Sequence, residues 1–184
     1  MKIKMAMDRK GGILSLSVII ATIAVDFFSK LIVMNNMQLY ESIPLIKDVL
    51  HLTYITNDGA AFGSFSEHRW VFMTMSTVMI LFMAVLLFLW TDKDPLFYTS
   101  VSMVLGGGVG NMIDRIAYGT VVDFIDFRAF PELWKWIFNG ADSFVCIGVG
   151  LFVLYYIRAE IKESKRKKEE AKEAETENVI SDEE

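Results

Sequence analysis

The segment Trp70–Trp90, WVFMTMSTVMILFMAVLLFLW, decides the fold class of this chain. It contains no charged residue, and as a helix it is long enough to cross the roughly 30 Å hydrocarbon core of a bilayer. A tryptophan stands at each end, which is typical of rings that prefer the membrane–water interface. We therefore predict that this segment is a transmembrane helix.

Three further apolar stretches are predicted to span the membrane, and they cover residues 13–34, 96–115 and 138–157. Hydrophobic residues make up 53% of the 184-residue chain, which is high for a soluble domain. These features predict an all-α membrane protein with four transmembrane helices in a single domain, residues 1–163. The remainder, residues 164–184, is rich in Lys and Glu and is predicted to be a solvated cytoplasmic tail.

Basic residues set the predicted orientation in the membrane. Four of them precede the first span, and six follow the last span between Arg158 and Lys168. Because Lys and Arg accumulate on the cytoplasmic side, both termini are predicted to face the cytoplasm. The connections at residues 35–69 and about 118–141 then lie outside the cytoplasm, and the chemistry is expected there.

Composition and spacing exclude several classes of function. Many of the acids behind the net charge of −5 lie in Glu169–Glu184, and no basic surface for nucleic acid is indicated. The single cysteine, Cys146, excludes an internal disulfide and is interpreted as a packed small side chain. His51 and His68 show no paired ligand spacing and no evident nucleophilic partner, so neither a metal site nor a cofactor is expected.

Ionisable residues inside the predicted spans need a partner or a function, because burying a charge in lipid is costly. Asp26 and Lys30 stand one helical turn apart in the first span and are interpreted as a structural ion pair. Asp114 and Arg115 end the third span. Upstream of them, the glycine-rich run at 106–110 is predicted to let helices pack closely.

The last span contains the most informative acid. To cross the bilayer core its helix must begin near Phe138, which draws Asp142 into the outer edge of the membrane. Asp142 has no basic residue at helical spacing, so its partner must come from elsewhere. The preceding connection offers Asp123 and Asp126 within Val121–Phe127, a segment that reads as a strand or a membrane-hugging turn. Spacing alone does not separate these two candidates.

Two neighbouring aspartates at a low-dielectric boundary cannot both ionise cheaply, so they share a proton. One carboxylate can then activate water while the other protonates the substrate carbonyl, which is the chemistry of an aspartic protease. A small proton-coupled transporter or channel, using Asp26, Asp114 and Asp142, is the main alternative, and a structural or assembly factor is the third. A proton path predicts acids throughout the membrane depth, whereas these three map to its outer third.

Five motifs resemble those of bacterial lipoprotein signal peptidase, also called signal peptidase II, a family of membrane aspartic proteases. They occur in the family's order, across residues 13–157: Asp26–Lys30, Asn57–Gly63, Gly110–Arg115, Val122–Phe124 and Phe138–Asp142. The resemblance implies removal of signal peptides from diacylglyceryl-modified prolipoproteins, with cleavage N-terminal to the lipidated lipobox cysteine. It places the active site at the extracytoplasmic face of the bacterial cytoplasmic (inner) membrane.

Carried onto this sequence, the resemblance implies that Asp123 and Asp142 are catalytic, that Asp126 is accessory, and that Asp26 and Lys30 are structural. A small extracytoplasmic β-rich element is implied between the first two spans. No cofactor is implied; the expected partners are the lipidated prolipoproteins and membrane lipid, the enzyme is expected to be a monomer, and globomycin should inhibit it. Other residues are implied to bind substrate or support the site: Asn57, Gly59, Ala60, Asn111, Asp114, Arg115, Asn139 and Ala141.

Overall fold

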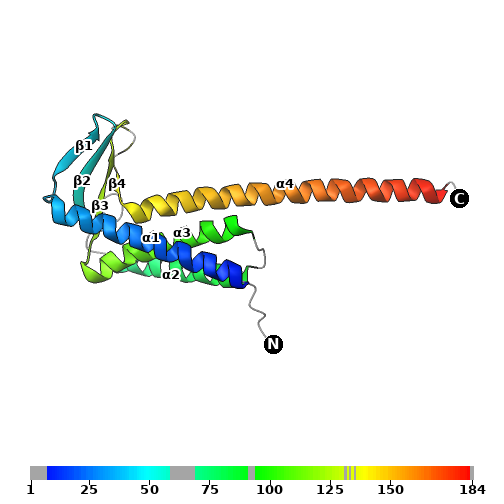
Figure 1. Ribbon diagram of the computed structural model, residues 1–184, viewed down its shortest axis with the longest axis horizontal. Helices are drawn as coiled ribbons and strands as arrows, with labels where there is room; N and C mark the ends of the chain where they lie inside the picture. Colours follow the sequence, from blue (N-terminus) through cyan, green and yellow to red (C-terminus); the bar gives the residue numbers. More distant parts are fainter. Residues whose placement is uncertain are drawn as a thin grey trace.

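The computed structural model of the chain describes residues 8–58, 69–90, 94–130, 132, 134 and 136–182. Its helices lie alongside one another as a bundle, the strands gather at one end, and one helix projects far beyond the other end (Figure 1). The elements follow in the order α1 (Arg9–Asn36), β1 (Ser42–Ile46), β2 (Leu50–Asn57), α2 (Arg69–Leu89), α3 (Pro95–Ala117), β3 (Val121–Phe127), β4 (Ile137–Phe138) and α4 (Gly140–Asp182).

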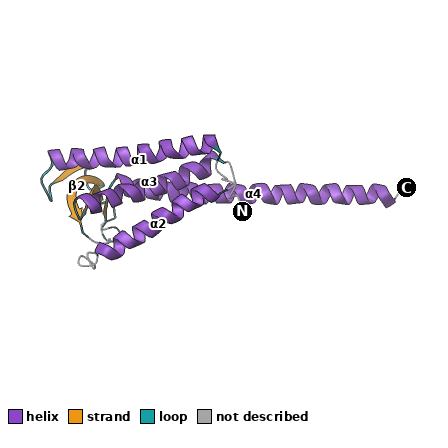
Figure 2. Ribbon diagram, turned by 90° about the horizontal axis from the view of Figure 1, so that it is seen from below, coloured by secondary structure: helices purple, strands orange, loops and turns teal. Residues whose placement is uncertain are grey.

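The strands form one antiparallel sheet in the order β1-β2-β3-β4. The central pairing of β2 with β3 runs from Leu50 opposite Phe127 to Asn57 opposite Val121. The sheet is therefore larger than the β-rich element predicted between the first two spans, because the connection between α3 and α4 contributes half of its strands. Figure 2 shows the sheet at the same end of the bundle from a second side.

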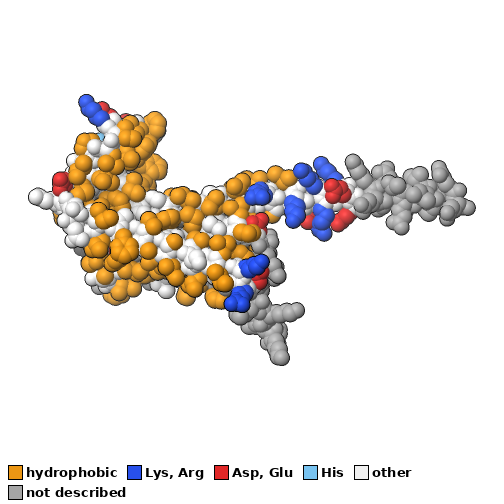
Figure 3. All heavy atoms as spheres, in the orientation of Figure 1, with side chains coloured by type: hydrophobic (Ala, Val, Ile, Leu, Met, Phe, Trp, Pro, Cys, Tyr) orange, Lys and Arg blue, Asp and Glu red, His pale blue; other side chains and the backbone are white. Residues whose placement is uncertain are grey.

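Among the residues that the structure describes, three helical segments are long and apolar enough to cross a membrane: Arg9–Asn36, Pro95–Ala117 and Gly140–Ala171. Within α2, the segment Met73–Leu89 is a shorter apolar helix. Apolar side chains cover the visible face of the bundle, while Lys and Arg gather mainly at the end away from the sheet and along the projecting part of α4 (Figure 3). This distribution fits a multi-pass membrane protein.

Helix α4 contains most of the last predicted span, 138–157, and extends beyond it. It begins at Gly140 rather than near Phe138, because Phe138 pairs with Ile125 as the end of the sheet. It also continues through the charged tail to Asp182. Ion pairs along its surface, such as Glu163 with Lys167 at 3.5 Å, stabilise such a helix in water.

Glycines let α3 pack closely against its neighbours. A Cβ atom on Gly107 would lie 2.5 Å from the backbone oxygen of Ala141 in α4, and one on Gly106 would lie 2.9 Å from Cβ of Thr22 in α1. Gly148 of α4 likewise lies against the backbone of Ser100.

The single cysteine was predicted to be packed, and this prediction was wrong. Cys146 is exposed, because it lies two residues before the buried Gly148 and therefore faces nearly the opposite side of α4.

We predict that Gly107→Ala destabilises the protein, by about 1–3 kcal/mol as for other overpacked sites, because the new Cβ meets backbone that moves only with α4. Gly150→Ala is the matched control, since a Cβ there meets nothing within 4 Å. Its stability should stay the same or rise slightly. Thermal unfolding of the purified proteins in detergent compares the two; equal stability of the Gly107 variant and the wild type would contradict this packing.

Candidate active site

Asn139 and Asp142 form the N-terminal cap of α4. The backbone N–H of Asp142 donates to Oδ1 of Asn139 at 2.9 Å, and the backbone N–H of Asn139 donates to Oδ2 of Asp142 at 3.2 Å. This is a capping box built from Asn and Asp. It places the Asp142 carboxylate at the positive end of the helix dipole. The local partner of Asp142 is therefore the neutral Asn139, three residues before it, and not a basic residue at helical spacing.

Asp123 lies on β3 with only 2% of its surface exposed. Its Oδ1 accepts a hydrogen bond from Nδ2 of Asn139 at 2.7 Å, and its Oδ2 accepts one from Nδ2 of Asn57 at 3.0 Å. The pairing of β2 with β3 brings Asn57 to this position. Asn139 therefore contacts Asp123 through its side chain and Asp142 through its cap, and so it links the two carboxylates.

The surroundings of Asp123 shift its protonation. The pKa of Asp123 is raised to about 7: burial is the largest cause and the nearby charge of Asp142 adds to it, while the hydrogen bonds from Asn57 and Asn139 act in the opposite direction. A carboxylic acid with such a pKa keeps its proton through mildly acidic conditions and releases it near neutrality. The site thus contains a carboxyl group able to donate a proton at physiological pH.

Asp126 belongs to a different hydrogen-bond network. It lies three residues from Asp123 on the same strand, and side chains alternate along a strand, so the two point to opposite faces. Its Oδ2 accepts hydrogen bonds from Thr53 Oγ1 at 2.6 Å and from Arg128 Nε at 2.7 Å. Burial acts to raise the pKa of Asp126, but the bonds from Arg128 and Thr53 outweigh it and hold that pKa below its usual range.

Asn111 of α3 connects Asp142 to the interior of the bundle. Its Nδ2 donates to Oδ1 of Asp142 at 2.8 Å. Its Oδ1 accepts from Nζ of Lys30 at 3.0 Å and from Nδ2 of Asn139 at 3.0 Å. An ammonium group can only donate, so Lys30 fixes which side of the Asn111 amide faces it. The donating side is thereby turned toward Asp142.

Lys30 lies between two buried carboxylates. Its Nζ is 2.7 Å from Asp26 Oδ2 and 2.9 Å from Asp114 Oδ2, and the three side chains are between 2% and 6% exposed. The second oxygen of Asp26 accepts the backbone N–H of Ala141 at 2.7 Å, and Asp114 accepts that of Val122 at 3.2 Å. The pairing expected between the two residues of α1 thus extends to α3, α4 and β3.

Of the remaining predicted site residues, two lie in the described part of the structure and two do not. Ala141 is fully buried at the start of α4, and Nη1 of Arg115 donates to the backbone oxygen of Asn111 at 3.2 Å. Gly59 and Ala60 lie outside the described residues. Among the residues that the structure describes, no group of three or more His, Cys, Asp or Glu side chains could hold a metal ion.

Comparisons with known proteins converge on one family. The sequence profile described as "Signal peptidase (SPase) II" matches residues 18–158. The lipoprotein signal peptidase of Halothermothrix orenii is 43% identical over 143 residues, which cover 78% of this chain and 94% of the relative. That of Brevibacillus brevis is 46% identical over 134 residues, covering 72% and 87%. A solved structure titled as a bacterial membrane enzyme at 2.3 Å superposes with a TM-score of 0.71 at 28% identity, covering 78% of this chain and 87% of that chain.

We predict that Lys30→Met strongly destabilises the protein, because Asp26 and Asp114 would remain buried with their shared cation removed. Breaking a buried pair in this way typically costs about 3–5 kcal/mol. Lys10→Met is the control, since Lys10 lies on the same helix but is exposed. The yield of folded protein and its melting temperature in detergent measure the effect. A Lys30 variant as stable as the Lys10 variant would show that the ammonium is dispensable.

Proposed function

Because this chain belongs to the signal peptidase II family, we propose that Asp123 and Asp142 are its catalytic carboxylates. The protein is a multi-pass bacterial membrane peptidase that removes signal peptides from prolipoproteins. One observation carries the assignment of the pair: Asn139 donates to Asp123 while sharing a capping box with Asp142. Asp126 is bound instead to Thr53 and Arg128.

The two carboxyl groups suit different roles. Asp123 is buried and its pKa is raised to about 7, so it keeps its proton below that pH. This fits a group that protonates the carbonyl oxygen of the scissile bond. Asp142 is half-buried and accepts hydrogen bonds from Asn111 and the backbone of Asn139. It therefore takes the role of general base on the attacking water. Asp142 then gives the proton taken from water to the leaving nitrogen, the C–N bond breaks, and a hydroxyl of the tetrahedral diol returns a proton to Asp123, so no cofactor is needed.

We place the sheet and the catalytic pair at the extracytoplasmic face, with α1–α4 as four spans and both termini in the cytoplasm. The concentration of Lys and Arg at the end away from the sheet supports this orientation (Figure 3). The apolar core of a signal peptide ends near the outer leaflet, which brings the scissile bond to this depth. The diacylglyceryl group on the substrate cysteine can then stay in the lipid beside the site.

Polar side chains around the pair are suited to hold the substrate backbone. Asn57, Asn111 and Asn139 have amide groups at the two carboxylates, and Arg115 adds a cation on α3. We assign cleavage N-terminal to a lipidated cysteine by a monomeric enzyme in the cytoplasmic membrane. Inhibition by globomycin belongs to the same proposal. Nothing in the comparisons supports a transporter or channel.

Replacing either catalytic carboxylate should abolish cleavage. We expect Asp123→Asn and Asp142→Asn each to lower kcat by at least about 100-fold, because general acid–base catalysis contributes at least that much. The measurement is cleavage of a lipidated prolipoprotein peptide by purified protein.

Asp126→Asn is the matched control, because it makes the same chemical change on the strand that carries Asp123, but on its opposite face. It should keep most of the activity once the amount of folded protein is equalised. Retained cleavage in the Asp123 or Asp142 variant would overturn the catalytic pair. Loss of cleavage in a well-folded Asp126 variant, with activity kept in the Asp123 variant, would move the role to Asp126.

The pH dependence follows from the proton on Asp123. Its pKa is raised to about 7, so the acid form is depleted above this pH and retained below it. We expect kcat/KM to fall on the alkaline side with a midpoint near pH 7, measured between pH 5 and 9 with the same peptide. The Asp126→Asn variant should show the same midpoint. A flat profile across this range would contradict the assignment of Asp123 as the acid.

A further inference from the structure

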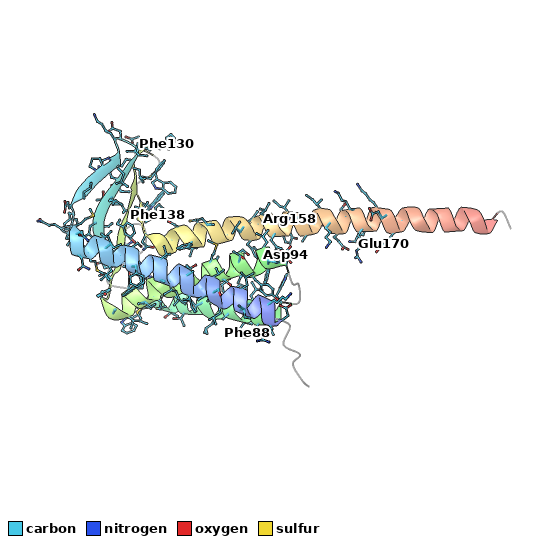
Figure 4. The ribbon with its side chains drawn as sticks, in the orientation of Figure 1. Phe88, Asp94, Phe130, Phe138, Arg158 and Glu170 are labelled. Atoms are coloured by element: carbon cyan, nitrogen blue, oxygen red, sulfur yellow. The ribbon has the colours of Figure 1, made fainter. Side chains whose placement is uncertain are left out.

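The projecting part of α4 carries a basic face where it leaves the bundle. Asp94 and Arg158 lie at this end, opposite Phe138 and the sheet (Figure 4). An open pocket of about 980 Å³ is present here. Its lining includes the bases Arg158, Lys162, Lys165 and Arg166 and the acids Asp94, Glu163 and Glu169. We call Arg158, Lys162 and Lys165 the basic face of α4; they are spaced four and three residues apart, so they share one side of the helix.

Aromatic residues mark where this end meets the membrane surface. Nε1 of Trp90, at the end of α2, donates to the hydroxyl of Tyr155 in α4 at 3.2 Å. Such side chains prefer the headgroup region, with their rings in the apolar layer and their polar atoms toward water. Beyond Tyr155, Arg158 lies about 4.5 Å further along the helix and Lys162 about 10 Å. Their long side chains can therefore reach lipid headgroups.

The positive charges of the basic face are available to an external anion, because they are not neutralised by ion pairs within the described part of the protein. Arg166 pairs with Glu163 at 2.7 Å and Glu170 at 3.5 Å, and Lys167 pairs with Glu163 at 3.5 Å. In the part of the chain that the structure describes, Arg158, Lys162 and Lys165 take part in no ion pair. Glu163, an acid in the pocket lining, is thus occupied by Arg166 and Lys167.

Charge is also segregated along the helix. Six basic residues lie between Arg158 and Lys168, and the following segment, Glu169–Glu184, is predominantly acidic. An anionic surface attracts the first segment and repels the second. This order favours a negatively charged membrane next to the bundle over an acidic protein partner bound further along the tail.

We propose that the basic face of α4 and its pocket bind the phosphate headgroup of an anionic phospholipid in the cytoplasmic leaflet. The Arg158 guanidinium can donate two parallel hydrogen bonds to a phosphate, while Lys162 and Lys165 contribute point charges. The inference rests on the orientation proposed above, and it is independent of the catalytic pair.

The test is native mass spectrometry of the detergent-purified full chain with phosphatidylglycerol or phosphatidylcholine. The wild type should retain phosphatidylglycerol in preference, and added salt should weaken this binding. The double variant Lys162→Gln/Lys165→Gln should bind phosphatidylglycerol roughly 30-fold more weakly, because each lysine near an anionic surface contributes about fivefold to the affinity. Lys167→Gln with Lys168→Gln removes the same charge from residues outside the pocket lining and should weaken binding less than about fivefold, because these residues lie further along the helix and the attraction falls off within a Debye length of the surface.

Equal weakening by the two double variants would overturn the site, because it would indicate diffuse attraction to the whole basic segment. Equal retention of both lipids by the wild type would also overturn it. Cleavage activity separates this proposal from the catalytic one: the Lys162/Lys165 variant should cleave peptide in detergent as the wild type does. The Asp142→Asn variant should lose cleavage and still bind phosphatidylglycerol.

Discussion

The buried ammonium of Lys30 is the interaction on which the rest of the structure depends. It lies within 2.9 Å of carboxylates from α1 and α3, and those carboxylates also accept backbone N–H groups at the start of α4 and in β3. A buried ion pair contributes little net stability, because desolvation offsets attraction, whereas removing one partner leaves an uncompensated charge. We infer that the cluster mainly selects one arrangement of the helices and the sheet over the alternatives.

Neutral amide side chains connect the Lys30 cluster to the two aspartates by hydrogen bonds. Lys30 orients Asn111, Asn111 donates to Asp142, and Asn139 donates to Asp123. A lysine or arginine in place of Asn139 would hold Asp123 as well, but its positive charge would lower the pKa of that carboxyl. The amides of Asn111 and Asn139 hold the two carboxyl groups in position without adding a positive charge beside them. The burial that raises the pKa of Asp123 to about 7 can therefore keep its effect.

The features of the fold that depend on neighbouring residues could be predicted from the sequence. Apolar length located the helices, and helical spacing paired Asp26 with Lys30. Spacing could not choose between Asp123 and Asp126, because the choice depends on which face of β3 meets α4. The pairing of β2 with β3 joins segments far apart in the sequence, so local spacing does not reveal it. The cap between Asn139 and Asp142 is also local, but its partner is neutral, so a pattern of opposite charges does not reveal it.

One continuous helix joins the two ends of the molecule. A helix rises about 1.5 Å per residue, so Asp142 and Arg158 are separated by about 24 Å along α4. With the reach of the arginine side chain, this is close to the thickness of the bilayer core. If headgroups hold Arg158 at one surface, the length of α4 places Asp142 near the other, at the depth where a spanning signal peptide ends. The depth of the candidate site is then set from both ends: by the Lys30 cluster beside it, and by the basic face across the membrane.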